Sequence, residues 1–441
     1  MVSIAFGGIA AVLFRGANLL ISFGLIVLTS RVLDREDAGR FVFGIVVVGI
    51  VTAATNGLTA ATAYQVSNQR RLPGEVLANG AGIAVPIAVL VLLVGVAAGP
   101  ILRGEYGHDA LPIAVAAAAV ALNSVIAGVF LGREAIIRYN LALVVPPLFA
   151  LIAIAAVFVA GTQTPTAALW AYAAGWWSAI VLLLFTGDLL VGIRPTLSRV
   201  LTISILRFAI LAGGASAISF FNYRGPVFVV DHFEGKAAVA VYSYAVYIAE
   251  SVWQVSGSLA LVTYPRLGSS TRSEAAALAA RVMRHTLVLL GVLCIVLFAA
   301  AGVIQEIIFP RYEGMATALR ILLPGVFIYG LSQSYSGFYI YQRGMPWMVS
   351  AVAGTALVIN IGLALLLVPE LGINGAAWAS ATGYAVAIVV ALAFFIRSER
   401  LSPFAPFAVG RAELQDYRDF VRRLRALIRG EDSAASPSGP T

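Results

Sequence analysis

Long apolar runs separated by short polar segments dominate this sequence up to about residue 396. A membrane-spanning helix needs about 20 predominantly apolar residues. This criterion predicts spans at residues 7–30, 41–63, 80–101, 111–131, 142–160, 166–187, 204–231, 238–262, 286–308, 317–341, 348–368 and 375–396. The apolar residues are continuous along each run, whereas the strands of a transmembrane β-barrel would alternate at every second residue. The pattern therefore predicts an all-α integral membrane protein with about twelve transmembrane helices.

Composition agrees with this interpretation. The 441 residues are 60% hydrophobic and only 11% charged, which is too few charges to cover the surface of a soluble protein. The net charge of +8 does not indicate nucleic-acid binding, because the arginines lie between apolar runs, as topology signals do. Cys294 is the only cysteine, which excludes a disulfide framework and a thiolate metal site. The first run lacks a basic n-region and a small-residue cleavage site, so we interpret it as a span rather than a removable signal.

The distribution of arginine predicts the orientation. Most arginines fall in every second loop and in the C-terminal tail, so the positive-inside rule places both termini in the cytoplasm. The opposite, outer loops have about five to twelve residues, which leaves no room for an extramembrane catalytic module. The longest inner connection, 265–284, contains SEAAALAARVMR, for which we expect a short interfacial helix.

An internal repeat predicts the domain organisation. At an offset of about 201 residues, DREDAGRFVFGIVVV (34–48) lies over GKAAVAVYSYAVYIA (235–249), which aligns Phe41 with Tyr242 and Phe43 with Tyr244. Shared membrane composition is the alternative explanation of this match. Six spans per half would give both halves the same orientation, so we predict two parallel six-helix lobes around a central cavity, at residues 1–200 and 201–397.

The third predicted region is a cytoplasmic tail at residues 398–441. RAELQDYRDFVRRLRALIRG can form a basic amphipathic helix on the anionic inner leaflet, or a helix that is only solvated. The final SAASPSGPT has a disordered composition.

Charged residues inside the spans are the first candidates for function. Arg15 lies about nine residues into the first span, and Arg224 lies beside Pro226 in the span at 204–231. An arginine at such a depth is costly unless it faces a polar cavity or pairs with an acid, and the sequence leaves both alternatives open. Arg207 begins the same span, where it could be an interfacial residue.

The span at 238–262 supplies a candidate acid. A single helix face there carries Ser243, Tyr247, Glu250, Gln254 and Ser258. This face could bind sugars, relay protons, or only hold helices together. Aromatic and amide residues near the inner end of the span at 317–341 predict an interfacial belt; they are Gln333, Tyr335, Tyr339, Tyr341 and Gln342. No metal-ligand spacing, nucleophile elbow or phosphate loop is present, so we expect neither an enzyme nor a cofactor.

Three segments resemble a known family. They are LTSRVLDREDAGRF, VYSYAVYIAESVWQVSGSLALVTYPRLG, and YQRGMPWMVSAVAGTALVINIGLALLLVPELGINGAAWAS with its mid-helix Asn360 and Pro369. The sequence resembles the polysaccharide-type flippases of the MOP (multidrug, oligosaccharidyl-lipid, polysaccharide) exporter superfamily. The resemblance implies two six-helix lobes that close alternately around a cationic cavity lined by the spans one, two, seven and eight. It also implies transport of undecaprenyl-pyrophosphate-linked oligosaccharides across a bacterial inner membrane.

Carried over to this sequence, the resemblance makes Arg15 and Arg224 candidate contacts of the pyrophosphate and places Glu250 and Gln254 at the same cavity. The drug-exporting branch has an acidic cation site in its first span, whereas this span has Arg15 and Asn18 and no acid before Asp34. The predicted substrate-binding residues are Arg15, Asn18, Arg207, Arg224, Tyr247, Glu250 and Gln254.

The leading hypothesis is therefore a flippase for a surface-polysaccharide repeat unit, driven by the membrane potential or by proton or sodium coupling at Glu250. Its expected partners are the polyprenyl-linked glycan, membrane lipids, and the polymerase and glycosyltransferases of the same pathway, without nucleic acid. A cation-coupled drug antiporter of the same superfamily and a membrane glycan polymerase or ligase are the alternatives.

Overall fold

The computed structural model describes residues 4–102, 105–186 and 196–410, together with Gln415, Arg418 and Arg422. The regular elements of these residues are all helices: α1 (Ile4–Val32), α2 (Arg35–Ser67), α3 (Pro73–Leu102), α4 (Glu105–Gly132), α5 (Ile136–Val159), α6 (Pro165–Thr186), α7 (Arg199–Glu250), α8 (Trp253–Ser269), α9 (Arg272–Ile308), α10 (Met315–Gly330), α11 (Ser332–Gly337), the π-helix η1 (Phe338–Gln342), α12 (Trp347–Leu371) and α13 (Ile373–Ser398). The predicted tail helix and disordered C-terminus lie almost entirely outside the described residues.

The predicted all-α membrane fold is confirmed. Within the described chain, eleven helical segments are long and apolar enough to cross a membrane, so this is a multi-pass membrane protein. This count takes residues 199–260 as one segment, which holds both of the predicted spans 204–231 and 238–262. Gly235 reverses the chain within α7 with φ 78° and ψ −176°, a conformation open to glycine because it has no Cβ.

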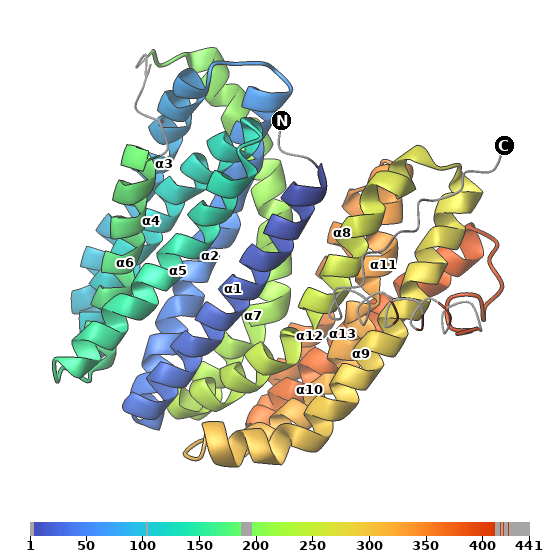
Figure 1. Cartoon of the computed structure of the whole chain (residues 1–441). Helices are drawn as coiled ribbons and strands as arrows, with labels where there is room; N and C mark the ends of the chain where they lie inside the picture. Colours follow the sequence, from blue (N-terminus) through green and yellow to red (C-terminus); the bar gives the residue numbers. More distant parts are fainter. Residues whose placement is uncertain are drawn as a thin grey trace.

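The helices form two bundles. Figure 1 shows α1–α6, the N-terminal bundle, beside α8–α13, the C-terminal bundle, with α7 joining them. The bundles converge at one end, which we call the closed end, and separate toward the end where α1 begins and α8 ends, which we call the open end.

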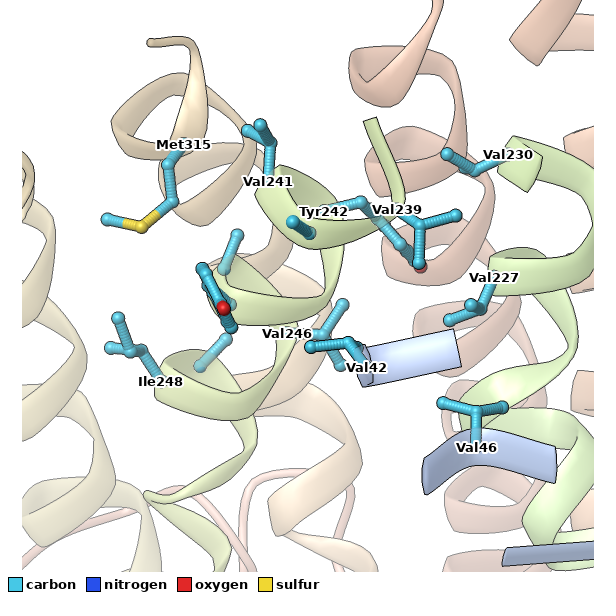
Figure 2. Packing of buried hydrophobic residues seen from close by; sticks show 14 of the residues in the cluster. Val42, Val46, Val227, Val230, Val239, Val241, Tyr242, Val246, Ile248 and Met315 are labelled. Atoms are coloured by element: carbon cyan, nitrogen blue, oxygen red, sulfur yellow. The ribbon is translucent and has the colours of Figure 1, made fainter. Parts of the chain in front are cut away.

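The apolar cores explain this shape. At the closed end one core combines residues of both bundles, among them Val42, Val230, Tyr242 and Met315 (Figure 2). Toward the open end the core divides in two. One part holds α2–α7 around Leu58 and the other holds α8–α13. The closed end is thus a single packed region, whereas the open end has no shared core among the described residues.

Small residues fix α7 against α2. A Cβ on Gly57 would collide with the backbone of Ala209 and Gly213, and a Cβ on Gly213 would collide with the carbonyl oxygen of Ala54. Close backbone approach at small residues is a common means of helix association in membranes, where the hydrophobic effect does not drive helices together. The first half of α7 is therefore held by the N-terminal bundle.

The segment SEAAALAARVMR is helical but does not form a separate interfacial helix. It makes up the first turns of α9, which begins after a capping box between Thr271 and Glu274. Ala275, Ala279 and Met283 are buried in the core of the C-terminal bundle. The buried face runs on without interruption into the predicted span, so the two are one helix.

The predicted interfacial belt was wrong for two of its tyrosines. Tyr335 on α11 and Tyr339 on η1 are each only 3% exposed and pack around Phe395 of α13. Tyr341 is 51% exposed. The span divides at Leu331 and again at the π-helix η1, and this turns Tyr335 and Tyr339 into the core.

Candidate functional site

The centre of the candidate site is an ion pair between the two arms of α7. Arg224 Nη1 lies 2.8 Å from Glu250 Oε2, and their side chains are 17% and 10% exposed. The turn at Gly235 makes the pair possible because it brings residues 26 positions apart to the same level. The Arg224 guanidinium also lies 4.6 Å from the centre of the Tyr247 ring, within cation–π range.

Glu250 has a second partner in the C-terminal bundle. The hydroxyl of Tyr384, on α13, donates to Glu250 Oε1 at 3.2 Å. Both carboxylate oxygens are therefore engaged, one by a cation and one by a neutral donor. Burial of this charge is stabilised by pairing and by hydrogen bonds together.

The helix breaks directly after Glu250. Residues 251–252 form a turn between α7 and α8, and the amides of Gln254 and Val255 donate three residues back to Ser251 and Val252. The predicted continuous face from Ser243 to Ser258 is thus interrupted. Glu250 is the last residue of α7, before the break, whereas Gln254 follows the break in α8 and is exposed.

An aromatic cluster packs beside the ion pair. Tyr223, Trp253, Tyr329 and Tyr384 come from four different helices, and all their ring centroids lie 4.9–6.3 Å apart. The hydroxyls of Tyr223 and Tyr329 are 2.9 Å apart, and the Trp253 indole donates to the Val326 carbonyl. The sequence analysis missed this cluster, since no periodicity joins residues from separate helices.

Asn360 links three helices through buried hydrogen bonds. Its side-chain nitrogen donates to the Asn222 carbonyl at 2.8 Å, and its oxygen accepts from Ser380 at 3.1 Å. The Ser380 hydroxyl in turn lies 2.8 Å from the Tyr242 hydroxyl. This buried network connects α7, α12 and α13, and it explains the polar residue in the middle of an apolar span.

Arg15 lies between the bundles. Its side chain is exposed and lies near Tyr139 on α5 and Tyr264 on α8, one from each bundle. A Cβ on Gly257 of α8 would stand 3.8 Å from Arg15 Nη1. Asn18 is exposed one turn further along α1.

Arg207 does not join the ion pair. It is 17 positions before Arg224 on α7, or about 25 Å along a helix axis. It is exposed and lines a groove of about 570 Å³ with Ser204 and Phe208. The structure therefore brings together Arg224, Tyr247 and Glu250 and leaves Arg207 nearer the open end.

A second charged cluster closes the open end of the C-terminal bundle. Glu399, just after α13, accepts from Arg272 at 2.7 Å and from Arg343 at 2.8 Å. Burial alone would raise the pKa of the Glu399 carboxyl, but the hydrogen bonds and charges of these two arginines outweigh it and lower the pKa. The cluster ties α9, the segment after η1 and the end of α13 together.

No group of three or more His, Cys, Asp or Glu side chains in the described ranges is arranged to hold a metal ion. Neither a protein-family model nor a curated protein sequence matches the chain.

Solved structures do match it over most of its length. An inward-facing multidrug resistance MATE family transporter of the MOP superfamily has a TM-score of 0.72 and 16% identity, covering 87% of this chain and 94% of that one. An outward-facing MATE family transporter has a TM-score of 0.62 and 16% identity, covering 89% and 94%.

A third structure is described as a MOP superfamily transporter from Pyrococcus furiosus whose binding pocket has reverse polarity, which suggests a different function. It has a TM-score of 0.57 and 16% identity, with coverage of 89% of this chain and 94% of that one. The expected superfamily resemblance is confirmed at the level of the fold: this chain has the fold of the MATE transporters of the MOP superfamily.

Proposed function

We propose that the chain exports a polyprenyl-pyrophosphate-linked oligosaccharide, moving it from the inner to the outer leaflet of a bacterial inner membrane by alternating access. The fold supports transport, since solved structures of this fold are described as inward-facing and outward-facing transporters. The higher TM-score to the inward-facing structure agrees with the separation of the bundles at the arginine-rich open end.

The net positive charge of the candidate site residues supports an anionic cargo. Glu250 is neutralised by Arg224. Arg15 and Arg207 are exposed and form no ion pair with an acid among the residues that the structure describes. The sum over these four side chains is two positive charges. A phosphate-bearing headgroup fits such a surface better than a cation does.

The membrane potential could supply the driving force. Moving two negative charges outward across about 100 mV, inside negative, releases roughly 4–5 kcal/mol. The glycan and pyrophosphate would pass between the bundles while the polyprenyl chain stays in the lipid.

The test is transport in proteoliposomes that contain a fluorescent polyprenyl-pyrophosphate oligosaccharide. Arg15→Gln and Arg207→Gln should each reduce transport at least about tenfold, because each removes a cation that meets the pyrophosphate, a loss of about 1.4 kcal/mol or more. Arg15→Lys should retain more activity than Arg15→Gln. Arg71→Gln, at a 51% exposed position, is the control and should transport normally.

A cation-coupled drug antiporter is the second candidate, because two of the structural neighbours are named multidrug resistance transporters. In that case the same vesicles would move ethidium against a proton or sodium gradient and leave the glycan lipid in place. Full glycan transport by both Arg→Gln variants would refute the anionic-cargo proposal.

A further inference from the structure

A large cavity lies away from the candidate site, against α2, α3 and α4. It has a volume of about 720 Å³, which is within the range of about 300–1,000 Å³ typical of ligand pockets. We call it the lateral cavity. Its walls are formed by α2, α3 and α4, with the α7 turn at one end. Leu90 and Val94 at its edge are 61% and 58% exposed, on the outside of the bundle.

The lateral cavity has the dimensions of one leaflet. Its lining on α2 runs from Arg40 to Val51 and on α3 from Leu90 to Leu102. At 1.5 Å per residue these stretches are about 16 and 18 Å long. Half of a hydrocarbon core of about 30 Å is about 15 Å, so the cavity matches the depth of a single acyl chain.

The cavity is also polar at one end and apolar along the rest, as a membrane leaflet is. All four charged lining residues lie at the end near the α7 turn, and the lining deeper in the membrane is apolar. They form two ion pairs. Arg40 lies 2.9 Å from Asp109, and Lys236 lies 2.5 Å from Asp231. The lining thus carries two positive and two negative charges, and Asp37, outside the lining, also pairs with Arg40 at 3.4 Å.

A zwitterionic headgroup fits this end. Its phosphate can accept from Lys236 while its ammonium donates to Asp231, and the charge balance of the lining is kept. A primary ammonium suits the site better than a choline group, since choline has no N–H to donate to a carboxylate. The face of Phe43 is already occupied by the Lys236 ammonium, 3.3 Å from the ring centre.

We propose that the lateral cavity binds a phospholipid with an ethanolamine headgroup, one acyl chain lying along α2 and α3. The site is separate from the ion pair of Arg224 and Glu250 and does not depend on the cargo. It fills the space between α2, α3 and α4 beside the α7 turn.

Native mass spectrometry of the purified full chain tests this with defined lipids of one chain composition. Phosphatidylethanolamine should remain bound in preference to phosphatidylglycerol and phosphatidylcholine. Ala98→Phe places a ring inside the cavity and should lower retention about tenfold, since displacing about two methylene groups is enough for that loss. Ala97→Phe is the matched control, because Ala97 is exposed and lies outside the lining.

A second pair covers the case in which Ala98→Phe fails to fold. Val94→Trp at the edge should weaken retention, and Leu93→Trp, 62% exposed and outside the lining, should not. Equal retention by Val94→Trp and Leu93→Trp would overturn the site. Equal binding of phosphatidylglycerol by the unmodified chain would overturn the headgroup assignment. Preferential retention of a polyprenyl phosphate would also overturn the proposal, since the cavity would then hold the cargo's tail.

Discussion

The substitution Glu250→Gln tests whether the ion pair in α7 is buried and stabilises the fold, or is solvated and contributes little. Glutamine preserves the size of the side chain and can still accept from Arg224, but it leaves the guanidinium without a counter-charge. Arg224 is only 17% exposed. Loss of the charge therefore leaves a largely buried cation uncompensated.

The expected cost follows from the geometry. At 2.8 Å and an effective dielectric constant of about 20, the gross attraction is about 6 kcal/mol. Desolvation of both ions offsets much of this attraction, and removing one partner of a buried pair costs about 3–5 kcal/mol. Because glutamine retains a hydrogen bond, we expect the lower limit, about 3 kcal/mol. At roughly 2 °C per kcal/mol for a large chain, the unfolding midpoint should fall by about 6 °C.

Thermal unfolding in a single detergent, followed by intrinsic fluorescence, measures this shift. The double variant Arg224→Gln/Glu250→Gln should recover about 2 kcal/mol relative to Glu250→Gln, because removing both charges abolishes the unpaired cation. Glu313→Gln, at an exposed position, is the control and should stay within about 0.5 kcal/mol of the unmodified chain. If Glu250→Gln is as stable as Glu313→Gln, or if the double variant is no more stable than Glu250→Gln, the pair is solvated and the reasoning fails.

Three further predictions concern the rest of the chain. Because the pKa of Glu399 is lowered in the folded chain, its ionised form stabilises the fold at pH values above about 4.3, the ordinary pKa of glutamate. This stabilisation is lost as the pH falls through the lower pKa of the folded chain. Glu399→Gln should therefore remove this acid-dependent loss of thermal stability. Gly39→Ala should destabilise the chain by about 1–3 kcal/mol in thermal unfolding because its Cβ would collide with the Lys236 backbone, whereas Gly16→Ala, with open space around it, should be neutral or stabilising. Asn360→Ala should cost about 1 kcal/mol, and a chain as stable as the unmodified one would contradict the bridging role of this side chain.

The apolar pattern predicted most of the fold, because membrane thickness dictates the length of each helix and lipid requires internal backbone hydrogen bonds. It failed where local geometry rather than hydropathy decides. The helix breaks after Glu250 although residues 251 and 252 are neither glycine nor proline, so the sequence does not predict the break. Residues 273–284 form the first turns of α9 and continue into the predicted span at 286–308 without a break, and hydropathy alone does not show that the two are one helix.

The sequence indicated the two charged residues of the ion pair but not the residues of other helices that contact them. An arginine deep in a span demands a cavity or an acid, and this requirement pointed to Arg224 and Glu250 together. Helical periodicity placed Tyr247 and Glu250 on one face of the same segment. Tyr384 and the aromatic cluster come from other helices, so their arrival at the pair depends on tertiary packing that a single sequence does not specify.

The ion pair between Arg224 and Glu250 changes which arginines are available to bind an anion. The sequence gives Arg15 and Arg224 equal standing as contacts of an anion. In the structure Arg224 is already neutralised by Glu250, and an anion must displace a bound carboxylate to reach it. Arg15 stands exposed between α5 and α8 without such a competitor among the described residues. An anionic cargo that enters from the open end therefore meets uncompensated positive charge at Arg15 and Arg207, and the pair at Glu250 instead fixes the two arms of α7 to each other.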